Sequence, residues 1–313
     1  MDFGVYLRSG VTYEGILSIA QTADNLGFYG GFINDHVHGF ANDGKEPYLE
    51  AWTVMTGIGV QTKRLRIGHV VLFNSLRNPA YLAKSISTLD NMIQGRYEVM
   101  LGAGWNESEY LGYDIMGNGR GMPSAKERVD RFRETLEILR GMFTHEVFSY
   151  DGKYWKLKNA INIPQPVQNP MRISVGGQKP RMVRLAATLA DGLNVPGSLD
   201  KLESTLELLL PNLEKAGKKM ADYYYSGFGG IYYAKNEEDY EKQVAKVAET
   251  QKKPIQEVRK NLFIGTSEIL VEKLRKASDL GVKLLVFAPR PAKSVEETNE
   301  LLATLRDEVF SQL

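Results

Sequence analysis

Residues 65–101 read LRIGHVVLFNSLRNPAYLAKSISTLDNMIQGRYEVML, and the order of the apolar runs in this stretch decides the fold. Leu65–Phe73 is a strand-like run, Ala80–Met92 has the apolar period of a helix, and Tyr97–Leu101 is again strand-like. A strand, a helix and a second strand in this order predict two parallel strands joined by a right-handed crossover.

The same unit repeats in both directions along the chain. Further strand-like runs are Phe3–Leu7, Gly30–Asn34, Arg172–Val175, Asp191–Val195, Tyr224–Tyr233 and Leu284–Ala288. Further helical stretches are Tyr13–Leu26, Leu49–Gln61, Ser124–Met142, Pro180–Leu189, Leu199–Ala216, Glu237–Thr250, Ser267–Leu280 and Val295–Ser311. Eight such units favour a closed (β/α)8 TIM barrel over a doubly wound open sheet, which six strands normally complete. Composition does not shift along the chain, so residues 1–313 are predicted to form a single domain.

Three segments add to the bare alternation. Residues 148–160, FSYDGKYWKLKNA, have a turn at Asp151-Gly152 between alternating aromatic flanks and predict a β-hairpin. The loops Asp35–Pro47 and Asn106–Pro123 each follow a strand. In a barrel, loops that follow strands lie at the C-terminal face, where active sites are built.

Composition and charge exclude several classes of function. With 39 basic against 38 acidic side chains, the net charge of +1 argues against nucleic-acid binding. The chain has no cysteine, which excludes disulfides, thiolate metal sites and cysteine nucleophiles. The start Met-Asp-Phe-Gly has no signal-peptide features, and no apolar run reaches the roughly 20 residues of a membrane span. We therefore expect a cytoplasmic protein with no membrane partner.

Two titratable residues follow strands at the predicted face. His36 comes directly after the second strand, beside Asp35, and Glu107 lies in the glycine-containing segment LGAGWNESEY, residues 101–110, after the fourth. A histidine beside a carboxylate suits acid–base work near neutral pH, and Glu107 is expected to point into the barrel mouth. The alternative for His36 is an ordinary surface-loop histidine. His69 is expected to be an interior residue, and the spacing of the four histidines predicts no catalytic metal.

The segment ISVGGQ, residues 173–178, joins a strand to a helix through two glycines. Free N–H groups and the helix dipole at such a point favour an anion, and Arg181 and Arg184 follow in the first turns. The alternative is a simple tight turn. The spacing matches neither a P-loop nor the glycine pattern of a dinucleotide fold.

Several motifs in fixed order resemble the bacterial-luciferase-like monooxygenase superfamily. They are NPAYLAK (78–84), TLD (88–90), QGR (94–96), LGAGWNE (101–107), GG (176–177) with ADG (190–192), and IGT (264–266) with LGV (280–282). The resemblance implies a TIM-type barrel that binds a flavin or deazaflavin at its mouth. Asp35-His36 together with Glu107 resembles the branch that uses coenzyme F420.

The resemblance also implies roles for particular residues. In that branch, His36 and Glu107 would give acid–base assistance to hydride transfer between F420 and a small organic substrate, and Asp35 would position the ring edge or orient the loop. It further implies a bulge over His69–Asn74 with a cis peptide at Val70-Val71, and a homodimer formed through Leu49–Gln61 and Ala80–Met92. The implied cofactor contacts are Asp35, Val70, Val71, Leu72, Trp105, Asn106, Tyr110, Gly176, Gly177, Gln178, Pro180 and Arg181.

Departures from the family pattern leave the substrate open. Dehydrogenases of this branch carry a further glutamate after the first strand, where this chain reads Tyr6-Leu7-Arg8-Ser9-Gly10. The chain has no match for the basic residues that hold a sugar phosphate in those enzymes. An FMN-dependent monooxygenase and a non-catalytic flavin-binding barrel are the alternatives.

Overall fold

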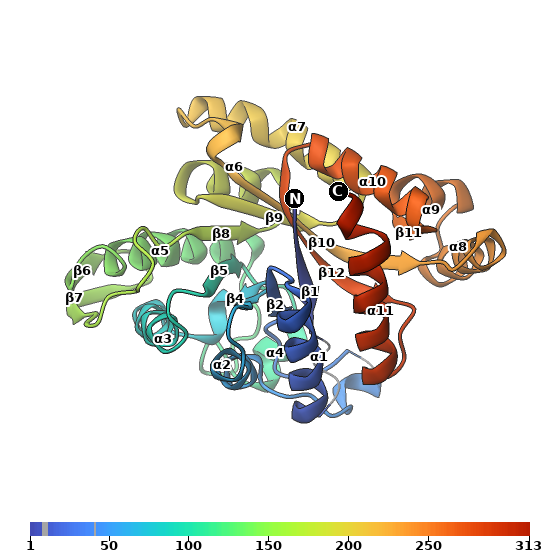
Figure 1. Cartoon of the computed structure of the whole chain (residues 1–313). Helices are drawn as coiled ribbons and strands as arrows, with labels where there is room; N and C mark the ends of the chain where they lie inside the picture. The colour runs from blue at the N-terminus through green and yellow to red at the C-terminus, as the bar shows by residue number, and fades with distance from the viewer. Residues whose placement is uncertain (8–11, 41) are drawn as a thin grey trace.

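Eight parallel strands close into a ring in the computed structural model, which describes residues 1–7, 12–40 and 42–313. Position 41 and residues 8–11, which include part of the segment where relatives carry the further glutamate, lie outside the described residues. The ring runs through β1 (Asp2–Tyr6), β2 (Gly30–Ile33), β3 (Arg66–His69) with β4 (Leu72–Phe73), β5 (Tyr97–Gly102), β8 (Ile173–Gly176), β9 (Gly192–Pro196), β10 (Tyr224–Tyr233) and β12 (Val282–Arg290), which pairs again with β1 (Figure 1). The predicted (β/α)8 TIM barrel is confirmed.

Helices surround this ring on the outside (Figure 1). They are α1 (Tyr13–Leu26), α2 (Ala51–Gln61), α3 (Pro79–Met92), α5 (Ala125–Met142), α6 (Pro180–Leu189), α7 (Leu199–Lys215), α10 (Ser267–Asp279) and α11 (Val295–Glu308), with α4 (Glu107–Gly112), α8 (Glu237–Gln251) and α9 (Ile255–Asn261) as additions. Short 3-10 turns span Asn42–Gly44, Asn74–Leu76, Met220–Asp222 and Phe310–Gln312.

Local capping sets where the helices begin. Asn78 accepts a hydrogen bond from the Ala80 N–H at 2.9 Å, and Pro79 takes the first position of α3. The helix predicted from Leu49 begins only at Ala51, because the Glu50 carboxylate caps it and accepts from the N–H groups of Trp52 and Thr53.

Two strands differ from the simple pattern. The predicted third strand is divided, because β3 ends at His69 and β4 begins at Leu72. The ten-residue β10 pairs with β9 through its first half and with β11 (Phe263–Gly265) through its second half, Ile231–Tyr233. A three-residue strand has too short a pattern to be predicted from the sequence, and neither β11 nor α9 was expected.

The predicted hairpin is confirmed as β6 (Val147–Asp151) and β7 (Lys156–Ile161), which pair antiparallel. Its turn lies just beyond Asp151, and the Gly152 N–H donates to the Trp155 carbonyl at 2.9 Å. The buried Glu134 carboxylate of α5 accepts from three N–H groups of this turn, including that of Tyr154 at 2.9 Å. This contact holds the hairpin against α5.

Side chains of the ring strands alternate between two of the three apolar clusters among the described residues, as the pleat of the strands requires. The larger core lies between the ring and the helices. The smaller one fills the barrel and contains Phe32, Val70, Met100, Tyr224, Leu284 and Val286. Because the interior is filled, a ligand can enter only above this core, at the end where the strands finish.

Candidate active site

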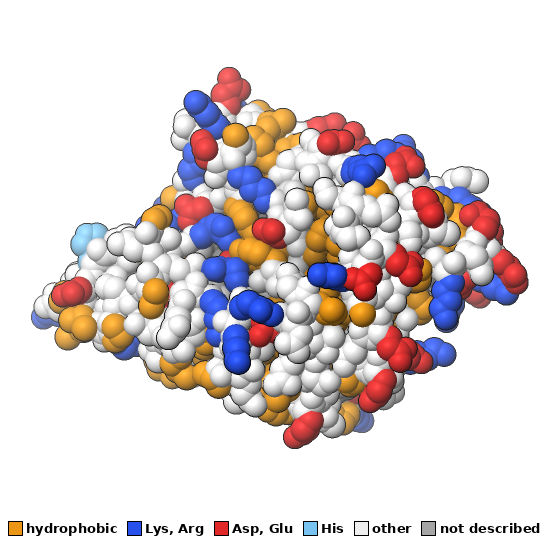
Figure 2. All heavy atoms as spheres, in the orientation of Figure 1, with side chains coloured by type: hydrophobic (Ala, Val, Ile, Leu, Met, Phe, Trp, Pro, Cys, Tyr) orange, Lys and Arg blue, Asp and Glu red, His pale blue; other side chains and the backbone are white. Residues whose placement is uncertain are grey.

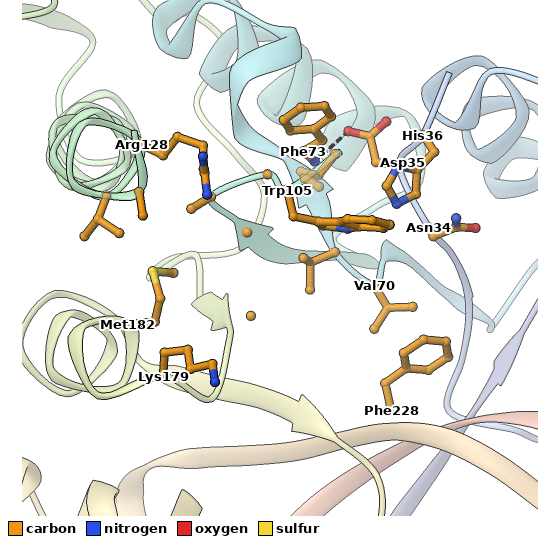
Figure 3. Close-up of a pocket in the computed structure, with 18 of the residues that line it drawn as sticks. Asn34, Asp35, His36, Val70, Phe73, Trp105, Arg128, Lys179, Met182 and Phe228 are labelled. Carbon is orange, nitrogen blue, oxygen red and sulfur yellow. Dashed lines mark hydrogen bonds between the residues drawn. The ribbon is translucent and has the colours of Figure 1, made fainter. Parts of the chain in front are cut away.

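The mouth of the barrel contains a cavity of about 830 Å³, which we call the mouth cavity. Residues that end β1, β2, β5 and β8 line it together with the first turns of α5 and α6 (Figure 3). Its volume lies within the range of about 300–1,000 Å³ that is usual for small-molecule sites.

Asp35 fixes the segment that follows β2. Its buried carboxylate accepts the Phe73 N–H at 2.9 Å and pairs with Arg77 at 2.6 and 3.1 Å. Burial alone would lower the pKa of Arg77, but Asp35 and Glu50 raise it above its ordinary value, so the guanidinium stays charged. Asp35 lines the mouth cavity with both oxygens already bound, which suits the expected role of orienting the loop.

His36 is held by Glu109 of α4. The His36 Nδ1 atom lies 2.9 and 3.0 Å from the two carboxylate oxygens of Glu109, and the Val37 N–H donates to the same carboxylate at 2.9 Å. Glu109 is buried, whereas His36 lines the mouth cavity. A carboxylate at Nδ1 favours a proton on that nitrogen, so a neutral His36 has its lone pair on Nε2. This nitrogen can accept a proton from a ligand.

The structure does not bring Glu107 to His36. Glu107 is the first residue of α4 and is exposed, and its side chain lies beside Gly121, away from the lining of the mouth cavity. Residues two apart on a helix do not share a face, so only one of Glu107 and Glu109 can point inward. The glutamate that contacts His36 is therefore Glu109, and not Glu107 as the sequence predicted.

Trp105 and Phe40 form the outer rim beside His36. Their rings stack with centroids 5.6 Å apart, and the His36 ring meets Phe40 edge-on at 4.7 Å and Trp105 at 5.7 Å. The neighbouring residues have structural tasks. Asn106 caps α4 by accepting from the Ser108 N–H, and the buried Tyr110 donates its hydroxyl to Ser75 at 2.9 Å.

The predicted bulge is present between β3 and β4, and its Val70-Val71 peptide is cis. Val70, Val71 and Leu72 all line the mouth cavity. Glycines on the two following strands make room for the Val71 side chain, since a Cβ at Gly102 or Gly176 would lie only 2.6 or 2.8 Å from it. The missing side chain of Gly176 thus serves the bulge.

The anion site expected at Gly176-Gly177 differs in the structure. Gly177 donates its N–H to the Asn194 carbonyl at 3.0 Å, so this group is not free for a ligand. Gly177, Gln178 and Pro180 are absent from the described lining of the mouth cavity, whereas Gly176 and Arg181 belong to it. No side chain caps the N-terminus of α6, which leaves its first turn as the better place for an anion.

Four basic side chains line the cavity where α5 and α6 begin. Lys126, Arg128, Lys179 and Arg181 form this group, which we call the basic end. The exposed Lys126 pairs with Asp130, and Arg128 donates to the Pro123 carbonyl, whereas no ion pair of Lys179 or Arg181 occurs among the described residues. Only Arg181 was predicted. The signal for the others was their position in first helical turns, which meet at this end of a barrel.

Within the described residues, no group of three or more His, Asp or Glu side chains is arranged to hold a metal ion. The same part of the chain has no helix long and apolar enough to span a bilayer.

Comparisons with known proteins agree with this architecture. A family model described as luciferase-like monooxygenase matches residues 1–284. The F420-dependent glucose-6-phosphate dehydrogenase of Nakamurella multipartita is 30% identical over 210 residues, which cover 66% of this chain and 59% of that protein. The chain therefore spans about three fifths of that relative's length.

Two solved structures resemble the whole chain. An F420-dependent secondary alcohol dehydrogenase in complex with an F420-acetone adduct superposes with a TM-score of 0.82 at 19% identity, covering 99% of this chain and 98% of that one. Monooxygenase RslO1 from Streptomyces bottropensis gives 0.81 at 19% identity, covering 100% and 99%. At such identities the likeness concerns the fold.

Proposed function

The chain belongs to the luciferase-like monooxygenase family, and from that premise we propose that it is an F420-dependent oxidoreductase acting on a small organic substrate. One observation carries the proposal. A histidine with one ring nitrogen fixed by a buried carboxylate lies in a cavity that is basic where α5 and α6 begin.

The residues of the mouth cavity fit a deazaflavin with an anionic tail. Lys179 and Arg181, with the uncapped first turn of α6, suit the phosphate and carboxylates of that tail. The apolar wall of Val70, Val71 and Leu72 suits its flat ring. When bound, the deazaflavin supplies the acceptor or donor of a hydride.

In this proposal His36 handles the proton of the substrate oxygen. Its Nε2 accepts the proton when an alcohol is oxidised and returns it when a carbonyl is reduced. Glu109 is a positioning residue, because it holds the Nδ1 proton and fixes the ring plane through a contact of 2.9 Å. Glu107, exposed on the outside of α4, has no part in the reaction.

Titration with the two possible cofactors tests the proposal. We expect F420 fluorescence to change saturably on addition of the protein, with one site per chain, and we expect FMN to compete poorly. Tight FMN binding without F420 binding would instead favour a flavin-dependent monooxygenase. Binding of neither would favour a barrel without redox chemistry.

We also propose that two copies of the chain associate. Seven apolar side chains on α2, α3, the hairpin and the segment after it are each more than half exposed: Val60, Tyr81, Met92, Val147, Ile161, Ile163 and Val167. Lys84 of α3 donates to the Ile163 carbonyl, so α3 and the segment after the hairpin lie side by side, and Figure 2 shows hydrophobic side chains along this edge. Sedimentation should reveal a dimer that Tyr81→Asp disrupts. A 35.1 kDa species at micromolar concentration would contradict it.

A further inference from the structure

The mouth cavity has a second end whose chemistry is opposite to that of the basic end. Around His36 it is lined by Tyr6, Phe40, Trp105 and Phe228, which we call the aromatic end. Figure 3 shows Arg128 and Lys179 on the side of α5 and α6, with His36 and Phe228 across the cavity and Trp105 between them.

Two aromatic side chains of the aromatic end are exposed. Trp105 is 63% exposed and Phe40 is 53% exposed, although both rings touch His36. Tyr6 and Phe228 form a second pair with centroids 5.2 Å apart. Exposed aromatic side chains beside a titratable group, inside a cavity, are well suited to stack on an apolar ligand.

Among the described residues of the aromatic end, no cation is available to a substrate. Asp35 is the acidic residue beside His36 in the described lining, and Arg77 neutralises it at 2.6 Å. The other carboxylate at His36 is that of the buried Glu109. Arg77 itself is held by Glu50 at 2.9 Å and faces the Trp52 ring. Among the described residues, a phosphate placed beside His36 would gain no cationic partner in exchange for its lost hydration, which is costly.

We propose, resting on the proposed function, that the substrate is an uncharged alcohol, or the corresponding carbonyl compound, that carries an aromatic or cyclic apolar group. Trp105 and Phe40 stack on that group and determine specificity, and the basic end is left to the cofactor tail. Oxidation breaks the O–H and C–H bonds at one carbon and forms C=O. The proton goes to His36 Nε2, and the hydride goes to F420, the two-electron acceptor of the proposed function.

A substrate panel tests this proposal separately from the cofactor. After F420 binding has been measured by titration, F420 reduction is followed with 1-phenylethanol, cyclohexanol, 2-propanol and glucose 6-phosphate. We expect 1-phenylethanol and cyclohexanol to have kcat/KM values about tenfold above that of 2-propanol, because they offer a ring or apolar surface to the aromatic end. Glucose 6-phosphate should give no turnover.

Two variants and a matched control assign the specificity. Trp105→Ala and Phe40→Ala should each lower kcat/KM for 1-phenylethanol about tenfold relative to 2-propanol, mainly through KM. F420 affinity should stay within about threefold, which would assign Trp105 to the substrate and not to the cofactor contact that the family resemblance implies. Leu210→Ala removes an apolar side chain that is 45% exposed on α7, a helix that does not contribute to the described lining of the cavity, and should change neither value.

The outcomes separate the two proposals. A protein that binds F420 and oxidises glucose 6-phosphate in preference to the alcohols would overturn the inference and leave the proposed function standing. F420 binding with neither turnover of the alcohols nor saturable binding of acetophenone would also overturn it. An equal loss for 1-phenylethanol and 2-propanol in Trp105→Ala would remove the specificity role of that residue. Failure to bind F420 would refute the proposed function itself.

Discussion

At the base of the barrel Glu98 accepts hydrogen bonds from Arg66, Arg172 and Tyr29, whereas at the mouth Glu109 holds His36. Both carboxylates are buried. At the base, Tyr29 lies 2.7 Å and Arg172 2.7 Å from Glu98, and Arg172 also lies over the Tyr224 ring at 3.6 Å. Burial and the charge of Glu98 raise the pKa of Tyr29 to about 12, so it remains a hydrogen-bond donor.

The mouth differs because His36 has a second ring nitrogen, Nε2, that Glu109 does not bind and that a ligand can contact. Glu109 takes one nitrogen of His36 and one backbone N–H, and the second nitrogen of the ring is left for the cavity. A buried glutamate therefore has a structural role at the base and positions a histidine at the mouth. Buried charge that is fully paired within the protein contributes to structure, and a pair that leaves a titratable atom open is a candidate for chemistry.

Removing His36 should have the largest effect. If His36 gives general acid–base assistance, His36→Ala should lower kcat by about 10²–10⁴-fold, with F420 affinity within a few-fold. His145→Ala, an exposed histidine beside the hairpin, is the control and should have the parent rate. Steady-state kinetics with the preferred alcohol give the kcat of both variants. An unchanged kcat in His36→Ala would show that His36 has no catalytic role.

Removing Glu98 should affect stability and not chemistry. Glu98→Ala leaves two arginines at the base without their buried partner, and we expect a loss of about 3 kcal/mol in the free energy of unfolding. Urea unfolding measures this, with Glu241→Ala as the control, since a surface ion pair such as Glu241–Arg259 contributes only about 0–1 kcal/mol. A stable Glu98→Ala protein with impaired turnover would reverse the roles assigned to the two ends.

Glu109 and Glu107 can be separated by matched variants. Glu109→Gln removes the carboxylate that orients His36 and should lower kcat by about 10²-fold with KM unchanged, because small misplacements of a catalytic group have effects of that size. Glu107→Gln alters an exposed residue of the same helix and should leave kcat at the parent value. The opposite result would restore the expectation drawn from the sequence.

Periodic features of the sequence predicted most of the barrel, because each strand and helix carries its own apolar pattern. Local order placed Asp35 and His36 directly after a strand, and the family resemblance implied the bulge at Val70-Val71, which the structure contains. Which glutamate points inward could not be predicted, since it depends on where a six-residue helix begins, and Asn106 sets that start. The sequence also could not show that the Gly177 N–H is already bonded, because its partner is the carbonyl of Asn194 on the neighbouring strand.

A second comparison concerns His36, which lines the cavity, and His69, which is fully buried at the end of β3. Burial lowers the pKa of His69 from 6.5 to about 4, so an unfolded chain takes up a proton below pH 6.5 that the folded protein does not. Stability is therefore complete above that pH and falls as the pH decreases toward 4. When the pH falls from about 7 to about 5, the neutral His69 should lower the free energy of unfolding by about 2 kcal/mol. Urea unfolding at both pH values should show this loss in the parent protein and a smaller loss in His69→Gln. Equal losses in the two proteins would contradict a buried, neutral His69.

The smallest expected effect concerns the cations that distinguish the mouth from the base. Arg66 and Arg172 are paired with Glu98, whereas Lys179 has no ion pair among the described residues and is exposed. An exposed charge contributes about 0.2–1 kcal/mol, so Lys179→Gln should weaken F420 binding by only about two- to fivefold. Because salt screens exposed charges, the parent affinity should fall with ionic strength and the variant affinity should fall less. Lys156→Gln, which changes an exposed lysine of the hairpin, is the control for a general charge effect. If Lys179→Gln and the parent have the same affinity and salt dependence, the cofactor tail does not reach α6, and the basic end loses its assigned ligand.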